Sequence, residues 1–160
     1  MWERLQRFSL LTAEARGIFL RAAVLLPVIS ASLRIRGFRA TQEFLLRFLP
    51  LDRQASRDGD MACVQRDQDG TQLIARMVNA AVRHAWSAAT CLEKSLALWW
   101  LLRRRRIPCE LRIGARKTGG KFEAHAWVER GGVALNEPQQ EHRHYATFDA
   151  AFPLQSPEPR

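Results

Sequence analysis

The spacing of apolar residues changes at Pro108, and this change constrains the fold more than any other feature of the chain. Before Pro108, apolar residues recur every three or four positions, as in an amphipathic helix. After it, apolar and polar residues alternate, as in strands with one buried face. The pairs Gly119-Gly120 and Gly131-Gly132 separate the alternating runs and predict turns. The sequence therefore predicts an α+β fold, in which a helix packs on a small antiparallel sheet of three short strands.

Helical spacing also dominates the first half of the chain. Residues 1–50 have apolar residues at helical intervals, with a break expected near Pro27 because proline cannot donate the backbone hydrogen bond that continues a helix. Residues 51–70 are rich in Asp, Arg and Gly, which predicts a polar connection. Thr71 is expected to cap the next helix. We therefore expect a helical region over 1–50, a connection over 51–70 and a core over 71–160.

The charge of the chain raises the question of a nucleic-acid partner. The 160 residues include 25 Lys and Arg and 16 Asp and Glu, a net charge of +9, and Arg pairs well with phosphate. However, the arginines are scattered, and the one dense run, residues 103–106, follows an apolar helix, where cations complement the negative end of the helix dipole. We therefore expect no nucleic-acid partner, and we expect the excess charge to steer an acidic peptide or an acidic partner.

The cysteines follow no metal-binding or disulfide pattern. Cys63, Cys91 and Cys109 are odd in number and widely spaced, so we expect no metal, no cofactor and a reduced, cytoplasmic setting. The first residues lack the order of basic and then apolar residues that marks a secretory signal. Arg21 and Pro27 interrupt the apolar stretch over residues 18–33, which argues against an integral membrane segment.

A capping box precedes one of these cysteines. Thr90, followed three positions later by Glu93, is expected to start a helix with Cys91 at its first position. The unpaired N–H groups and the positive end of the dipole at such a position favour a thiolate, and the Cys91 N–H can stabilise an oxyanion. Taken alone, a cysteine on an apolar helix is more often a small core residue. Cys91 is therefore a candidate nucleophile that requires a nearby base.

His125, in the middle of an alternating strand, is the candidate base. A strand histidine is commonly just solvated or hydrogen-bonded, but a helix that opens with Cys and packs on a sheet with a central His often pairs thiol with imidazole. The following hairpin returns Asn136 or Glu137 toward His125, and either can accept its N–H. Trp86, shortly before Cys91, is expected either to line a substrate groove or support the oxyanion site, or only to close the preceding helix.

Several ordered motifs over about residues 70–140 resemble one family. They are Cys91-Leu92-Glu93-Lys94-Ser95-Leu96-Ala97-Leu98, the Arg-rich helix end with Ile107-Pro108, Leu111-Arg112-Ile113-Gly114, and Phe122-Glu123-Ala124-His125-Ala126-Trp127-Val128-Glu129. Together they resemble the transglutaminase-like leader peptidases of lasso-peptide biosynthesis. The resemblance implies a papain/transglutaminase-like core and a cysteine protease with Cys91 as nucleophile and His125 as base. This chain has Asn136-Glu137 where the family usually has an Asp, so the residue that orients the imidazole stays open.

The resemblance also implies a substrate and partners. The substrate is a ribosomally synthesised lasso-peptide precursor, whose leader peptide is removed before cyclisation. The implied partners are a separate leader-recognition-element protein and a lasso cyclase, and residues 1–50 are the expected docking region for a partner or leader.

Two other functions are compatible with the same residues. An acyltransferase would use the same Cys and His pair with an amine acceptor. A non-enzymatic basic module would bind a peptide or nucleic acid through its arginines and keep Cys91 buried.

Overall fold

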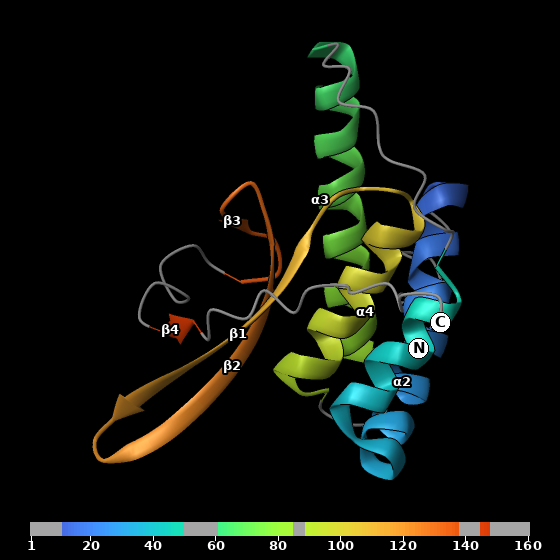
Figure 1. The fold of residues 1–160 in the computed structure, drawn as a ribbon. Helices are drawn as coiled ribbons and strands as arrows, with labels where there is room; N and C mark the ends of the chain where they lie inside the picture. Colours follow the sequence, from blue (N-terminus) through green and yellow to red (C-terminus); the bar gives the residue numbers. More distant parts are fainter. Residues whose placement is uncertain (1–10, 50–60, 85–88, 138–144, 148–160) are drawn as a thin grey trace, which may run out of the picture.

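The computed structural model describes residues 11–49, 61–84, 89–137 and 145–147, with the side chains of 61–67 left out. Three helices pack together on one side of a four-stranded antiparallel sheet of order β3-β2-β1-β4 (Figure 1). This arrangement confirms the predicted α+β fold. The helices are α2 (Ala13–Arg47), α3 (Met61–His84) and α4 (Cys91–Arg104), and the strands are β1 (Glu110–Thr118), β2 (Lys121–Arg130), β3 (Val133–Ala134) and β4 (Ala146–Thr147).

Helix α4 is the centre of the core. It contacts α2 and α3 as well as the sheet, chiefly β2, and its side chains Leu96, Leu98 and Leu102 are completely buried. Burying one such side chain contributes about 1.5–3 kcal/mol of folding free energy. The helix that begins at Cys91 is therefore held firmly, by packing against α2, α3 and the sheet. The residues that pack around it include Ile18 and Ile29 of α2, Ile74 and Val78 of α3, and Val128 of β2.

Helix α2 continues through Pro27, so the break predicted there is wrong. The backbone leaves the helical region at Gly37 instead, with φ +76° and ψ 179°, and glycine adopts a positive φ without a steric penalty. The Thr41 hydroxyl donates a hydrogen bond of 2.7 Å to the carbonyl oxygen of Gly37 across this kink. Pro27 lies on the exposed side of the helix, where the missing N–H is readily tolerated.

Helix α3 begins at Met61, so the predicted cap at Thr71 is wrong and part of the expected 51–70 connection is helical. Thr71 is only 2% exposed, and its hydroxyl accepts a hydrogen bond of 2.7 Å from Arg130. Threonine is a common capping residue, but here tertiary contacts bury Thr71 in the interior of α3 instead. The division of the chain at residues 50 and 70 stays a prediction.

The long β1–β2 hairpin places His125 opposite Gly114. The turn end of this hairpin extends beyond the helices (Figure 1). Phe122 is therefore 80% exposed, although the alternation places it on the apolar face of β2. The three predicted strands are confirmed, and β4 adds a fourth that pairs Gly114 with Thr147. A strand of two residues is too short to produce a hydrophobic period, so the alternation could not reveal it.

Candidate active site

The start of α4 is the predicted capping box. The Thr90 hydroxyl accepts a hydrogen bond of 3.3 Å from the Glu93 N–H, and Glu93 Oε2 accepts one of 2.7 Å from the Thr90 N–H. Cys91 is therefore the first residue of the helix, as expected. Its N–H, an amide in the first turn of a helix, has no acceptor within the helix itself.

The next turn of α4 shows which way Cys91 faces. Ser95 donates a hydrogen bond of 2.8 Å to the carbonyl oxygen of Ala126, the residue after His125 on β2. Residues four apart lie on the same face of a helix, so Cys91 lies on the side of α4 that packs against β2. Cys91 itself is partly buried. The fold therefore directs the helix-start cysteine to the strand segment that contains His125.

The imidazole of His125 is enclosed by aromatic rings. The Trp127 ring stacks near it with centroids 6.1 Å apart and an interplanar angle of 19°, and the Tyr145 ring lies 5.2 Å away. Nε2 of His125 is buried and has no hydrogen-bond partner among the described residues. These contacts restrict the orientation of the ring and limit the access of water to Nε2.

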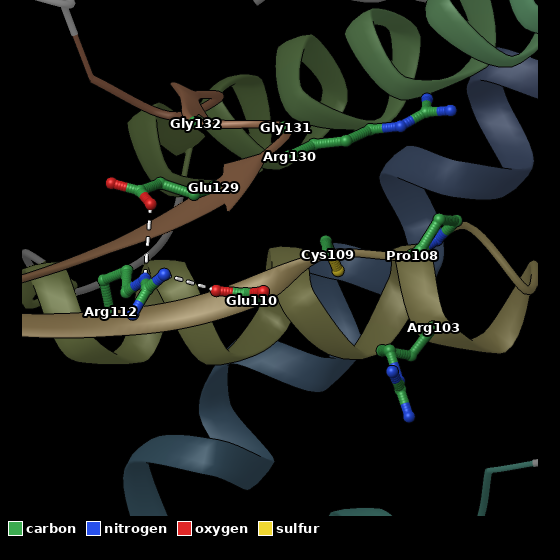
Figure 2. A pocket seen from close by; sticks show the side chains of 9 residues that line it. All are labelled: Arg103, Pro108, Cys109, Glu110, Arg112, Glu129, Arg130, Gly131 and Gly132. Atoms are coloured by element: carbon green, nitrogen blue, oxygen red, sulfur yellow. Dashed lines mark hydrogen bonds and ion pairs between the residues drawn. The ribbon is translucent and has the colours of Figure 1, made fainter. Parts of the chain in front are cut away.

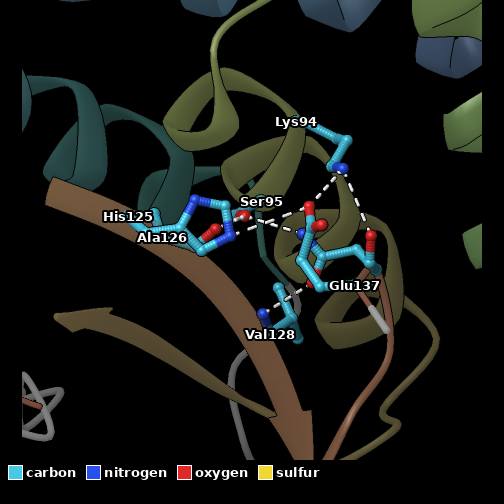
Figure 3. Close-up of polar contacts among 7 residues, drawn as sticks. Lys94, Ser95, His125, Ala126, Val128 and Glu137 are labelled. Carbon is cyan, nitrogen blue, oxygen red and sulfur yellow. Dashed lines mark hydrogen bonds and ion pairs between the residues drawn. The ribbon is translucent and has the colours of Figure 1, made fainter. Parts of the chain in front are cut away.

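Glu137 faces this imidazole. Its Oε1 lies 3.8 Å from Nε2 of His125 and 2.5 Å from Nζ of Lys94. Lys94 also donates a hydrogen bond of 3.2 Å to the carbonyl oxygen of Asn136. Figure 3 shows the carboxylate between the ammonium group and the imidazole. Lys94 therefore holds the carboxylate at the edge of the histidine ring.

Asn136 makes structural hydrogen bonds to α4 and β2 rather than to the imidazole. Its side chain accepts a hydrogen bond of 2.9 Å from the Val128 N–H and donates one of 2.9 Å to the Ser95 hydroxyl. It is only 6% exposed, and both contacts fasten the segment after β3 to α4 and β2. Of the two residues considered for orienting His125, Glu137 is the one whose side chain lies beside Nε2.

Other residues near the imidazole were not singled out from the sequence as part of a site. Lys94 and Ser95 were only members of a motif, although the spacing of Ser95 from Cys91 was a usable signal for a shared helix face. Trp127 is held by a hydrogen bond of 2.7 Å from its Nε1 to Glu129. Tyr145 follows a stretch without periodicity, so only the pairing of β4 reveals its position.

Trp86 lies outside the described residues, and its predicted role is untested.

The other described free cysteine is a poor candidate for a nucleophile. Burial raises the pKa of the Cys109 thiol to about 12 against the partly opposing effect of two nearby arginines. Cys109 lines a separate pocket of about 520 Å³, in which Arg112 bridges Glu110 and Glu129 at 2.6 and 3.2 Å (Figure 2). That pocket lies at the opposite end of the β1–β2 ladder from the turn, beyond His125, so it is distinct from the candidate active site.

A metal site is not evident in the part of the chain that the structure describes, where no three His, Cys, Asp or Glu side chains are grouped as ligands. The sequence-based expectation that the protein uses no metal or cofactor stays a prediction.

Comparison with known proteins identifies one family. The family model of the transglutaminase-like superfamily matches residues 25–148. The matched region contains Cys91, His125 and Glu137 together with the helix and strands that hold them. No curated protein and no solved structure matches the chain.

Proposed function

Because this chain belongs to the transglutaminase-like superfamily, whose members are generally cysteine-dependent enzymes, we propose that it is a cysteine endopeptidase that removes the leader peptide from a lasso-peptide precursor. The main support is the convergence of a helix-start cysteine on the strand of His125, with Glu137 Oε1 3.8 Å from Nε2 of that histidine. The motifs that resemble lasso-peptide leader peptidases support the choice of substrate.

The proposed reaction gives each of these groups a defined role. The Cys91 thiolate attacks the scissile carbonyl, and the Cys91 N–H stabilises the oxyanion that forms. Since Nε2 of His125 faces Glu137, Nδ1 is the nitrogen left to take the thiol proton and to return it to the leaving amine. Water then attacks the acyl-enzyme, with His125 as base, and releases the leader with a free carboxyl end. Glu137 orients the imidazole, and Lys94 holds Glu137.

The proposal includes partners and a location. A separate leader-recognition-element protein delivers the precursor, a lasso cyclase receives the core peptide, and the region over residues 1–50 docks the partner or leader. These events take place in the cytoplasm, where ribosomal precursors are made.

Cleavage of a leader–core precursor by purified protein tests the proposal. Cys91→Ala is expected to abolish cleavage without unfolding the protein, whereas Cys109→Ala, a matched removal of a buried thiol, retains it. Product masses separate two reactions: hydrolysis releases a free leader and a free core, and acyl transfer joins the acyl part to an amine. Undiminished cleavage by Cys91→Ala contradicts both.

Alkylation and salt distinguish an enzyme from a basic binding module. In the native protein, iodoacetamide should label the partly buried Cys91 and spare Cys109, which is 8% exposed. An unlabelled Cys91, together with binding to nucleic acid that falls steeply with salt, would favour the non-enzymatic module.

A further inference from the structure

The outward face of α2 is apolar where a soluble helix is usually polar. Its exposed residues between positions 20 and 31 are Leu20, Arg21, Ala23, Val24, Pro27, Val28 and Ala31. Leu20 is 54% exposed, Val24 66% and Val28 43%. Single exposed apolar residues are common, but a continuous run along one helix face marks a contact surface. We call the surface formed by Leu20, Val24 and Val28 the α2 apolar face.

The opposite side of the same helix is packed into the core. Ile18 and Ile29 are 2% and 0% exposed, and α2 contacts both α3 and α4. By length and composition α2 could cross a membrane, with a mean hydropathy of 1.8 over a window of which 22% is buried. Crossing would require α2 to leave the core, so the packing favours a helix that lies along a surface and exposes only its outer face to it.

The α2 apolar face borders a shallow hollow that is also lined by two arginines. The hollow, of about 430 Å³, lies between α2 and α4 and includes Trp100, Arg21 and Arg104 in its lining. The Arg104 guanidinium lies 5.1 Å from the centre of the Trp100 ring. Between positions 15 and 42, α2 contains five arginines and no acidic residue: Arg16, Arg21, Arg34, Arg36 and Arg39.

We propose that the α2 apolar face is a peripheral binding site for an anionic lipid bilayer. Apolar side chains that enter the acyl boundary and arginines at the level of the phosphates are the two contributions that hold a helix at such a surface. A second copy of the chain is a poorer occupant, because it would bring Arg21 and Arg104 against like charges. The proposal is independent of the reaction at Cys91. It assigns to the bilayer only the outward face of α2, within the wider region over residues 1–50 that is proposed above to dock the partner or leader.

Sedimentation with lipid vesicles tests this inference on the full chain. We expect binding to vesicles of equal parts phosphatidylglycerol and phosphatidylcholine, weaker binding to pure phosphatidylcholine, and loss of the difference at high salt. Val24→Asp should weaken binding at least about tenfold, since it replaces an apolar side chain at the acyl boundary with a negative charge. Val133→Asp, at an exposed valine of β3, makes the same charge change elsewhere and should bind almost normally.

Three results would overturn the proposal. The first is no sedimentation with anionic vesicles, and the second is equal loss of binding in Val24→Asp and Val133→Asp, which would show a general charge effect. The third is self-association that Val24→Asp abolishes, measured by analytical ultracentrifugation without lipid, which would assign the face to a second copy. Circular dichroism of each variant checks that the fold is intact.

Discussion

Oε1 of Glu137 lies 3.8 Å from Nε2 of His125, a little beyond hydrogen-bond distance. The same oxygen is 2.5 Å from Nζ of Lys94. The Glu137 carboxylate is thus shared between an ammonium group and the imidazole. Catalytic hydrogen bonds are often long in the absence of substrate and tighten when it binds, so this geometry is compatible with an orienting role for Glu137.

Substitution of Glu137 and Asn136 should give different defects. Glu137→Gln is expected to lower kcat about tenfold or more, because the imidazolium loses its neighbouring charge. Asn136→Ala removes two buried hydrogen bonds and is expected to cost about 2–4 kcal/mol of unfolding free energy. Turnover per folded molecule and urea unfolding measure the two effects. Full activity of Glu137→Gln, together with loss of turnover in folded Asn136→Ala, would show that Asn136 and not Glu137 orients the imidazole.

Cys109 makes stability depend on pH in the alkaline range. The pKa of its thiol is raised from 9.0 to about 12 by burial, so the folded state retains the proton more strongly than the unfolded state. The protonated thiol contributes its full stabilisation of the folded state below the unfolded pKa of 9.0, and this stabilisation is lost as pH rises toward 12. At most about 4 kcal/mol is involved. Urea unfolding of wild type and Cys109→Ala over this range should show a steeper alkaline loss in wild type, and parallel curves would contradict the prediction.

Gly114 allows β4 to approach the site. A Cβ there would lie 3.0 Å from the Ala146 carbonyl oxygen, the Trp127 ring and Cβ of Tyr145. Gly114→Ala should displace the rings beside His125, lower kcat and cost about 1–3 kcal/mol of stability.

Gly17→Ala is the matched control, since nothing beyond the adjacent residues and the helix's own backbone lies within 4 Å of the added Cβ and alanine favours a helix. It should leave kcat unchanged and stability unchanged or higher. An equal loss of kcat in both variants would show that Gly114 has no special role.

The capping box should affect both stability and catalysis. Thr90→Ala removes the oxygen that accepts from the Glu93 N–H and is expected to cost about 1 kcal/mol. It should also lower kcat, since the first turn of α4 holds Cys91. Thr90→Ser retains the oxygen and should retain both properties. Thermal unfolding and precursor cleavage provide the measurements, and a loss in Thr90→Ser equal to that in Thr90→Ala would contradict the capping role.

Local signals predicted the parts of the fold whose cause is local. The capping box placed the start of α4 correctly because both of its hydrogen bonds join residues three apart. The alternation after Pro108 and the Gly119-Gly120 pair predicted the hairpin, because the pattern of each strand and the turn residues lie within the hairpin itself. Predictions failed where long-range packing prevails: Thr71 is buried within α3 instead of capping it, and α2 passes through Pro27 and bends at Gly37.

The sequence alone determined that Cys91 begins a helix and that His125 lies in the middle of a strand, because capping and alternation depend on neighbouring residues. Only the tertiary structure decided which residue lies beside the imidazole. Asn136 and Glu137 are adjacent in the chain, but Ser95 and the Val128 N–H occupy the amide of Asn136, while Lys94 holds the carboxylate of Glu137 near Nε2. This choice depends on contacts between α4, β2 and the segment after β3, which no local pattern encodes.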